Sequence, residues 1–192
     1  QYVLGARAAV AGDGDHGFVI TYDDRGLGSD GDGSAVRAEI HVADDLIRGG
    51  ATAEALAGSD GGDTIYAGKG DDDVAAGDGN DLVYGESGAD TVHGDGGDDR
   101  IYGGFYGDAL FGDGGGDTIV GDIAELIAGS RGANDTIDGG ADDDDLYGDA
   151  FVLSAGSFGG RDTILGGAGD DRIHGDGGVA EAGAIGGNDR ID

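Results

Sequence analysis

Aspartates recur at intervals of nine or eighteen residues from position 63 to the end of the chain. The series is Asp63, Asp72, Asp81, Asp90, Asp99, Asp108, Asp117, Asp135, Asp144, Asp162, Asp171 and Asp189. Carboxylates are hard oxygen ligands of the kind that hard divalent cations take. Two of them about 4 Å apart repel each other by ~1 kcal/mol in water and ~4 kcal/mol near a protein surface. So regular an array therefore predicts either a segment that does not fold or a segment that binds cations.

The other reactive side chains form no arrangement typical of an active site. The four histidines, His16, His41, His93 and His174, lack a metal-binding spacing such as H-E-x-x-H. Neither Ser154 nor Ser157 lies in the G-x-S-x-G motif of a nucleophile elbow, because neither has a glycine two residues before it. A general acid needs a distinctive environment, whereas these carboxylates are periodic. We therefore expect no enzyme in this chain, and we expect His93 and His174 to be surface residues.

The composition limits the choice of partner. The chain has 192 residues, with 41 acidic and 10 basic side chains and a net charge of −31. This charge excludes a phosphate-binding face, so neither nucleic acid nor an anionic membrane is an expected partner. No apolar stretch approaches the ~20 residues of a membrane span. The chain starts without Met and ends within its repeat pattern, at GGNDRID, so we expect it to be part of a longer protein.

The turns and strands that position the aspartates are predicted from a division of the sequence into blocks of nine residues. Residues 58–120 divide into seven such blocks, each with Asp at position six and an aliphatic residue at position eight. Each block predicts a glycine-rich six-residue turn followed by a three-residue strand, in which position eight points inward and positions seven and nine point outward. One short strand is not stable alone, so the blocks must stack. The inward residues are Ile65, Val74, Val83, Val92, Ile101, Leu110, Ile119, Ile137, Leu146, Ile164, Ile173 and Ile191.

The repeat G-G-x-G-x-D-x-(aliphatic)-x resembles the nonapeptide of RTX (repeats-in-toxin) proteins, a calcium-binding parallel β-helix repeat. The resemblance is strong over residues 58–192 and weak over 40–57. It implies an all-β hemolysin-type parallel β-roll with two nonapeptides per coil. It also implies several Ca²⁺ ions between the turns of successive coils, held by the position-six aspartates and by turn carbonyls. The expected carbonyl ligands include those of Gly61, Gly70, Gly79, Gly88, Gly97, Gly115 and Gly169.

From Gly121 onward the period becomes 27 residues, because each pair of nonapeptides carries nine extra residues. These insertions are residues 123–131, 150–158 and 177–185. With two nonapeptides per coil, all three fall on the same side of the roll. They are either tolerated surface loops or stacked flaps that form a partner surface. Their apolar residues Ile123, Leu126, Ile127, Phe151, Val152 and Leu153 indicate that they cover something, and we expect Leu126 and Leu153 to be buried.

Position nine forms a second series on the side without insertions. Its members are Tyr66, Tyr84, Tyr102, Val120, Tyr147 and His174. Stacked strands lie ~4.8 Å apart, so these side chains are expected to line an outer face. The series is explained either by packing between neighbouring strands or by sugar binding or lateral assembly.

Residues 1–39 do not repeat. Alternating apolar residues predict two strands, one in GFVITYDD around Ile20 and one in AVRAEIHV around Ala38. We expect them to cap the first coil, because solenoids need capped ends. Residues 40–57 are expected to form that first coil in degenerate form.

The insertions also predict an asymmetry between the two sides of the roll. They enter the turn after Asp122, Asp149 and Asp176, between positions two and three. A contiguous turn is needed for several carbonyls to converge on one ion. We therefore expect a continuous calcium row on the uninterrupted side. On the insertion side we expect sites near Asp72, Asp90 and Asp108, and sparse or differently built sites near Asp135, Asp162 and Asp189.

Three functions fit these features. The first is a calcium-dependent folding module of a larger secreted or surface bacterial protein, for which the resemblance implies type I secretion to the extracellular space. The second is an interaction module that self-associates or binds extracellular polysaccharide, such as an adhesin, surface-layer or filament subunit. The third is the C-terminal part of a secreted protease or lipase.

Overall fold

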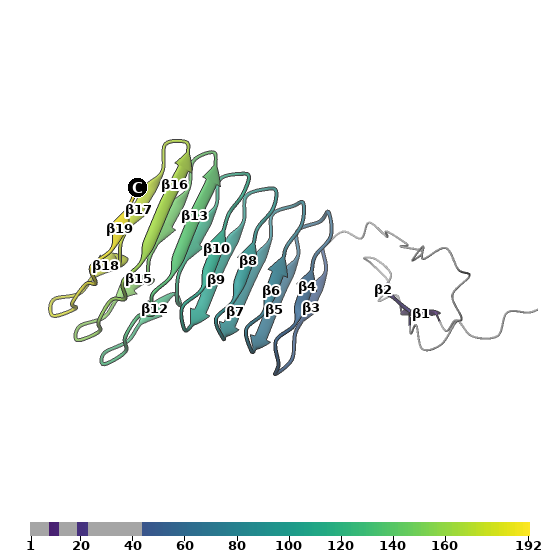
Figure 1. Cartoon of the computed structure of the whole chain (residues 1–192), viewed down its shortest axis with the longest axis horizontal. Helices are drawn as coiled ribbons and strands as arrows, with labels where there is room; N and C mark the ends of the chain where they lie inside the picture. The colour runs from purple at the N-terminus through teal and green to yellow at the C-terminus, as the bar shows by residue number, and fades with distance from the viewer. Residues whose placement is uncertain (1–7, 12–18, 23–43) are drawn as a thin grey trace, which may run out of the picture.

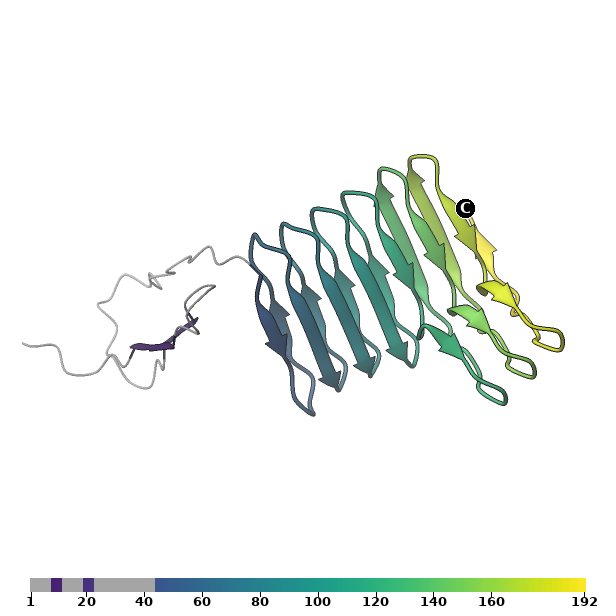
Figure 2. The same cartoon turned by 180° about the vertical axis from the view of Figure 1, so that it is seen from behind.

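A computed structural model describes residues 8–11, 19–22 and 44–192 of the chain. All regular elements in these residues are β-strands, and the strands of residues 44–192 pair in parallel. They wind into stacked coils with two sheets facing each other (Figure 1) and a third sheet beside the last three coils (Figure 2). The predicted all-β parallel β-roll is thereby confirmed.

The two main sheets have seven strands each. The tyrosine sheet contains β3 (Leu46–Arg48), β5 (Thr64–Lys69), β7 (Leu82–Ser87), β9 (Arg100–Phe105), β11 (Thr118–Val120), β14 (Asp145–Tyr147) and β17 (Arg172–His174). The opposite sheet contains β4 (Ala55–Ala57), β6 (Asp73–Ala75), β8 (Thr91–His93), β10 (Ala109–Phe111), β13 (Thr136–Ala141), β16 (Thr163–Ala168) and β19 (Arg190–Ile191). The insertion sheet contains β12 (Glu125–Leu126), β15 (Ala150–Leu153) and β18 (Gly177–Ala180).

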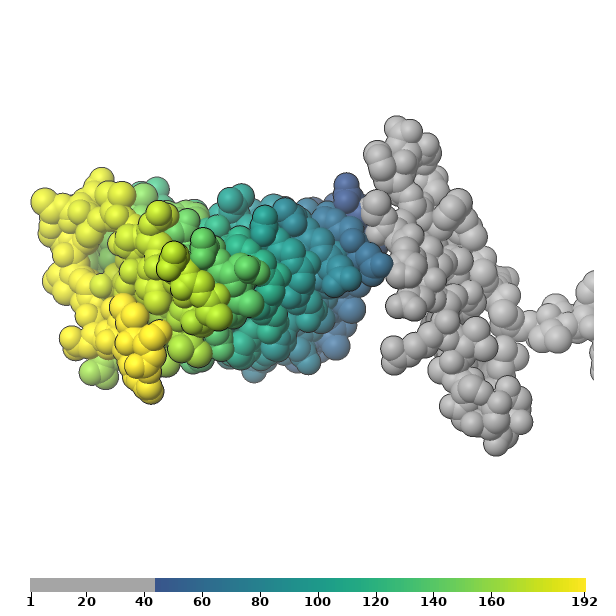
Figure 3. Space-filling model, turned by 90° about the horizontal axis from the view of Figure 1, so that it is seen from above, coloured from purple at the N-terminus to yellow at the C-terminus, as the bar shows by residue number. Residues whose placement is uncertain are grey.

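The strand register shows how many residues each coil contains. Ile65 pairs with Val83, and Val83 pairs with Ile101, so these coils have 18 residues, or two nonapeptides. Ile119 pairs with Leu146 and Ile137 pairs with Ile164, so the later coils have 27 residues. The coils follow one another in chain order along a single axis (Figure 3). Residues 18 apart in the early coils, or 27 apart in the later coils, thus occupy equivalent places in the fold.

Position eight of each block forms the core between the two main sheets. From Ile65 to Ile164 these side chains are at most 1% exposed, whereas positions seven and nine are mostly half-buried or exposed. The core is one aliphatic side chain thick on each sheet. Such a core buries little apolar area for each ordered residue, so the turns have to contribute to stability.

Several strands are longer than the predicted three residues. β5, β7, β9, β13 and β16 each have six, because the ladder continues through positions one to three of the next block. In eight turns the backbone has positive φ at both position two and position four. Most of these positions are glycine, but Tyr106 and Asp142 take position four with φ of 81° and 77°. Asp is among the residues that tolerate this region best, whereas Tyr is strained there.

The three insertions stack on each other in the insertion sheet. Leu126 pairs with Leu153, and Leu153 pairs with Ala180. Leu126, Ala150 and Leu153 form a second small core that Ile123 and Ala184 partly cover. The expected burial of Leu126 and Leu153 is therefore observed. The expectation for Ile127 was wrong, because its side chain is 62% exposed.

The insertion also completes the aromatic face of the tyrosine sheet. The rings of Tyr66, Tyr84 and Tyr102 stack with centroids 5.0 and 5.1 Å apart. Val120 interrupts this stack and is fully buried, contrary to its expected place on the outer face. Phe151 from β15 meets Tyr102 and Tyr147 edge-on at 6.1 and 4.7 Å, so its ring spans the interruption.

Before the roll, β1 (Ala8–Ala11) pairs antiparallel with β2 (Val19–Tyr22). β2 lies within the predicted strand GFVITYDD, but its partner β1 was not predicted from the sequence. The other predicted strand, AVRAEIHV, lies outside the described residues, and so does most of the expected cap.

Candidate metal sites in the turns

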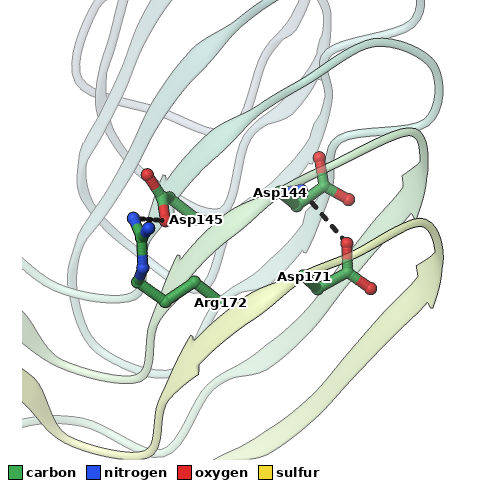
Figure 4. Close-up of polar contacts among 4 residues, drawn as sticks. All are labelled: Asp144, Asp145, Asp171 and Arg172. Carbon is green, nitrogen blue, oxygen red and sulfur yellow. Dashed lines mark hydrogen bonds and ion pairs between the residues drawn. The ribbon is translucent and has the colours of Figure 1, made fainter.

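The position-six aspartates of successive coils are joined in two ladders. One oxygen of each carboxylate, Oδ1, accepts a hydrogen bond from the backbone N–H of the equivalent residue one coil earlier. Asp81 N–H donates to Asp99 over 2.8 Å, and Asp90 N–H donates to Asp108 over 2.8 Å. Figure 4 shows the same bond, 3.1 Å long, from Asp144 N–H to Asp171 in the 27-residue coils. These bonds fix the orientation of each carboxylate against the roll.

The second oxygen, Oδ2, is buried and has no hydrogen-bond partner in nine of the twelve aspartates. These are Asp72, Asp81, Asp90, Asp99, Asp108, Asp117, Asp135, Asp144 and Asp162. A buried polar atom without a partner costs about 1–3 kcal/mol, and more when it is charged. So many in one regular array fit a bound cation, which accepts electron pairs from oxygen.

The glycine at position one leaves room beside this oxygen. A Cβ on Gly94 would collide with Asp99 Oδ2 and would lie 2.8 Å from the carbonyl oxygen of Gly112, one coil further on. A Cβ on Gly85 would lie 2.6 Å from Asp90 Oδ2 and would collide with the carbonyl oxygen of Gly103. A carboxylate oxygen and a backbone carbonyl thus meet in a space between coils that only glycine leaves open. A mixed set of carboxylate and carbonyl oxygens is what calcium takes.

Burial makes these carboxylates reluctant to ionise without a cation. It is the main reason that the pKa of Asp99 and that of Asp108 are raised to about 8. The negative charges of neighbouring aspartates raise both pKa values further, against the lowering effect of the backbone hydrogen bonds. The same causes raise the pKa of Asp117, Asp135 and Asp162 to about 7. A bound divalent cation would favour the ionised form and reverse these shifts.

Three of the twelve aspartates differ from the rest. Both oxygens of Asp63 are engaged, since Oδ1 accepts from Asp45 N–H and Oδ2 accepts from Ser59 N–H. Asp171 and Asp189 belong to the last coil and are only partly buried.

Of the seven glycines predicted to supply carbonyls, all except Gly61 have positive φ. The turn that ends at Asp63 therefore resembles the other turns of its row less closely than its sequence predicts.

The insertion turns keep the position-six ladder but lose the turn conformation. Asp108 N–H donates to Asp135 over 2.8 Å, and Asp135 N–H donates to Asp162 over 2.9 Å. None of these three turns has positive φ at position two or position four. The expected asymmetry in calcium occupancy remains a prediction, but the backbone of the two sides does differ in this way.

The position-two aspartates of these turns are functional candidates that were not predicted from the sequence. Asp122 and Asp149 are 3% and 0% exposed. Each accepts a hydrogen bond from the N–H of position four across the insertion, Asp149 from Gly160 over 2.7 Å and Asp122 from Ala133 over 3.1 Å. Asp176 accepts the equivalent bond from Gly187. The available signal was the dipeptide Gly-Asp, repeated at the start of all three 27-residue units.

No three His, Cys, Asp or Glu side chains converge as metal ligands among residues 8–11, 19–22 and 44–192. Any site in this region therefore needs backbone oxygens as well. Over the same residues, no helix is long and apolar enough to cross a membrane.

The profile of the RTX calcium-binding nonapeptide repeat matches this chain in six segments. They are residues 48–83, 57–92, 76–110, 93–123, 124–151 and 158–179, which cover about two thirds of the chain. No curated protein sequence matches the chain.

Proposed function

The chain belongs to the RTX calcium-binding nonapeptide repeat family, and from this membership we propose that it is a calcium-dependent folding module of a larger, secreted bacterial protein. RTX repeats bind calcium as structural modules. The observation that carries the proposal is the set of nine buried position-six carboxylates that each have one oxygen bonded and the other without a partner.

In this proposal the bonded oxygen and the free oxygen have separate tasks. Oδ1 of Asp99, fixed by Asp81 N–H, orients the carboxylate, and Oδ2 is presented to the ion beside the Gly112 carbonyl. The ion supplies positive charge between coils and joins them. Without it, a net charge of −31 opposes the stacking of a thin core, and the chain favours the unfolded state.

This coupling suits export followed by folding. Extracellular calcium modules often bind at ~10⁻⁴–10⁻³ M, above the calcium concentration inside a cell. The chain would leave unfolded through a type I secretion channel and fold outside, where calcium is abundant. An extracellular or cell-surface location follows from this proposal.

A calcium titration followed by far-UV circular dichroism tests the proposal. We expect little β structure in chelator and a cooperative gain of β signal as calcium is added, with magnesium at equal concentration much less effective. Retention of the full β signal and of a cooperative thermal transition in chelator would contradict it.

A second candidate, polysaccharide binding, is favoured by a groove on the tyrosine sheet. The groove has a volume of about 420 Å³ and is lined by Tyr84, Tyr102, Phe105 and Ile123 together with polar groups such as Glu86 and Lys69. A concave site lined by aromatic and apolar side chains with a few polar groups is the usual lining of a small-ligand pocket. A glycan array on the calcium-loaded protein tests this, with Tyr84→Ala as the variant expected to lose binding. Absence of any glycan signal would leave ordinary strand packing, or self-association, as the explanation of the aromatic stack.

A further inference from the structure

The position-two aspartates of the insertion coils meet in pairs that the nonapeptide repeat does not contain. A Cβ on Gly132 would collide with Asp149 Oδ1 and would lie 2.9 Å from Asp122 Oδ2. One coil further, a Cβ on Gly159 would collide with Asp176 Oδ1 and would lie 2.8 Å from Asp149 Oδ2. Carboxylate oxygens from two successive coils thus converge beside each glycine, and Asp149 takes part in both pairs.

The glycines are needed here for space and not for conformation. Neither Gly132 nor Gly159 has positive φ, so the backbone alone would accept other residues at both positions. Both glycines are buried, and each borders the space into which the two carboxylates point. Any side chain at these positions would displace the acid pair.

Asp149 provides independent evidence for a ligand. Its side chain is fully buried, and its Oδ2 has no hydrogen-bond partner although it faces the space beside Gly159. Its Oδ1 already accepts from Gly160 N–H. Two like charges brought together in a buried place require a counter-charge.

Backbone oxygens extend the ligand set. The carbonyl oxygen of Ala133 lies on the same side of the coil, since a Cβ on Gly160 would collide with it and would lie 3.0 Å from Asp149 Oδ1. Two carboxylates, a carbonyl and water are acceptable ligands for calcium, which takes 6–8 oxygens in flexible geometry. These pairs contain two acidic side chains each, in keeping with the absence of three-residue clusters among the described residues.

We propose that the insertion coils hold two additional calcium sites, one on the Asp122–Asp149 pair beside Gly132 and one on the Asp149–Asp176 pair beside Gly159. The inference rests on the proposed calcium-dependent function. It assigns the position-two aspartates the task of replacing turn carbonyls that the insertion displaces. Each ion would close the base of two insertions and join their coils.

The test is the number of calcium ions bound per chain, measured by native mass spectrometry and by equilibrium dialysis on the whole protein. Because Asp149 belongs to both pairs, Asp149→Asn should bind two ions fewer than the wild type. Asp122→Asn and Asp176→Asn should each bind one ion fewer. Asn retains an oxygen that accepts from the position-four N–H, so the base of the insertion stays closed. The matched control Asp73→Asn changes an exposed aspartate of β6 and should bind the wild-type number.

An unchanged count in Asp149→Asn would overturn the inference and leave a carboxylate pair held by a shared proton only. If Asp149→Asn loses its β signal in calcium, Asp176→Asn decides, because Asp176 is only partly buried and lies in the last coil. In that case, loss of one ion supports the inference and loss of none overturns it. A failure of the proposed function is distinguishable, because the wild type and Asp73→Asn would then bind no calcium at all.

Discussion

Replacing Asp99 with Asn should change stability in opposite directions with and without calcium. Asn has nearly the same shape as Asp and retains the oxygen that accepts from Asp81 N–H over 2.8 Å. Its amide would replace the free Oδ2 and could donate to the nearby carbonyl of Gly112. The substitution therefore removes one negative charge and one cation ligand and preserves the ladder bond.

Without calcium, removing the charge should stabilise the fold. The pKa of Asp99 is raised from 3.8 to about 8, chiefly by burial. Roughly four units at ~1.4 kcal/mol each set an upper bound of ~6 kcal/mol on the cost of the ionised form. Solvent screening at a turn reduces this cost by half or more, so we expect a gain of ~2 kcal/mol at pH 8.

With calcium, the sign should reverse. An ion present at 10 to 100 times its dissociation constant stabilises the fold by ~1.4 to ~2.7 kcal/mol. Loss of the Asp99 ligand removes most of this contribution from at least one site. We therefore expect Asp99→Asn to be destabilised by ~1–3 kcal/mol in 10 mM calcium.

The assay uses far-UV circular dichroism under both conditions. In calcium-free buffer, folding is driven with trimethylamine N-oxide, which favours compact states, and the Asn variant should fold at a lower concentration than the wild type. In calcium, its urea midpoint should fall. The control Asp99→Ala removes the same charge but also leaves the buried Asp81 N–H without an acceptor, so it should be less stable than Asp99→Asn in both conditions. A lower stability of Asp99→Asn in both conditions would refute the reasoning.

Three further predictions concern pH, the insertion core and a surface histidine. Since burial raises the pKa of Asp99 and Asp108 to about 8, the metal-free fold binds more protons than the unfolded chain between about pH 4 and pH 8. The stability of the metal-free fold therefore falls as the pH rises through this window. In calcium-free buffer the β signal should grow when the pH is lowered from 8 to 5, even in high salt that screens the general repulsion. A β signal that grows with rising pH would contradict this. In calcium, Leu153→Ala should lower the free energy of unfolding by ~2–4 kcal/mol because Leu153 is 1% exposed. The control Leu165→Ala, at a 43% exposed position, should cost under ~1 kcal/mol. Equal urea midpoints of the two variants would show that the insertion core contributes nothing. His93 pairs with Asp113 at the surface over 2.8 Å, so His93→Ala should leave the calcium midpoint of folding unchanged, and a shift as large as that of Asp99→Ala would mean that the ligands are misplaced.

The period of the sequence was sufficient to predict the stacked strands and their core, and the resemblance to the RTX nonapeptide supplied the roll with two blocks per coil. Position eight is aliphatic in every block from Ile65 onward, and the strand register places these residues above one another. The change from 18 to 27 residues per coil was also readable, because an insertion of constant length preserves the phase of the aspartates. Position-six carboxylates could be identified as a ladder for the same reason. A repeat makes equivalent residues occupy equivalent places, so the stacking of the blocks follows from their spacing.

Contacts between the insertions and the roll depended on the tertiary structure. Nothing in the spacing of Phe151 predicts that its ring meets Tyr102 and Tyr147 across the buried Val120. Likewise, the pairing of Asp122 with Asp149 arises only when the insertion returns to its starting point and two coils stack there. The carboxylate oxygens without a hydrogen-bond partner also depended on the tertiary structure, since burial and hydrogen bonding decide which of the two oxygens of each carboxylate is satisfied. Periodicity determines which residues are equivalent, but the path of each insertion through space determines which of them touch.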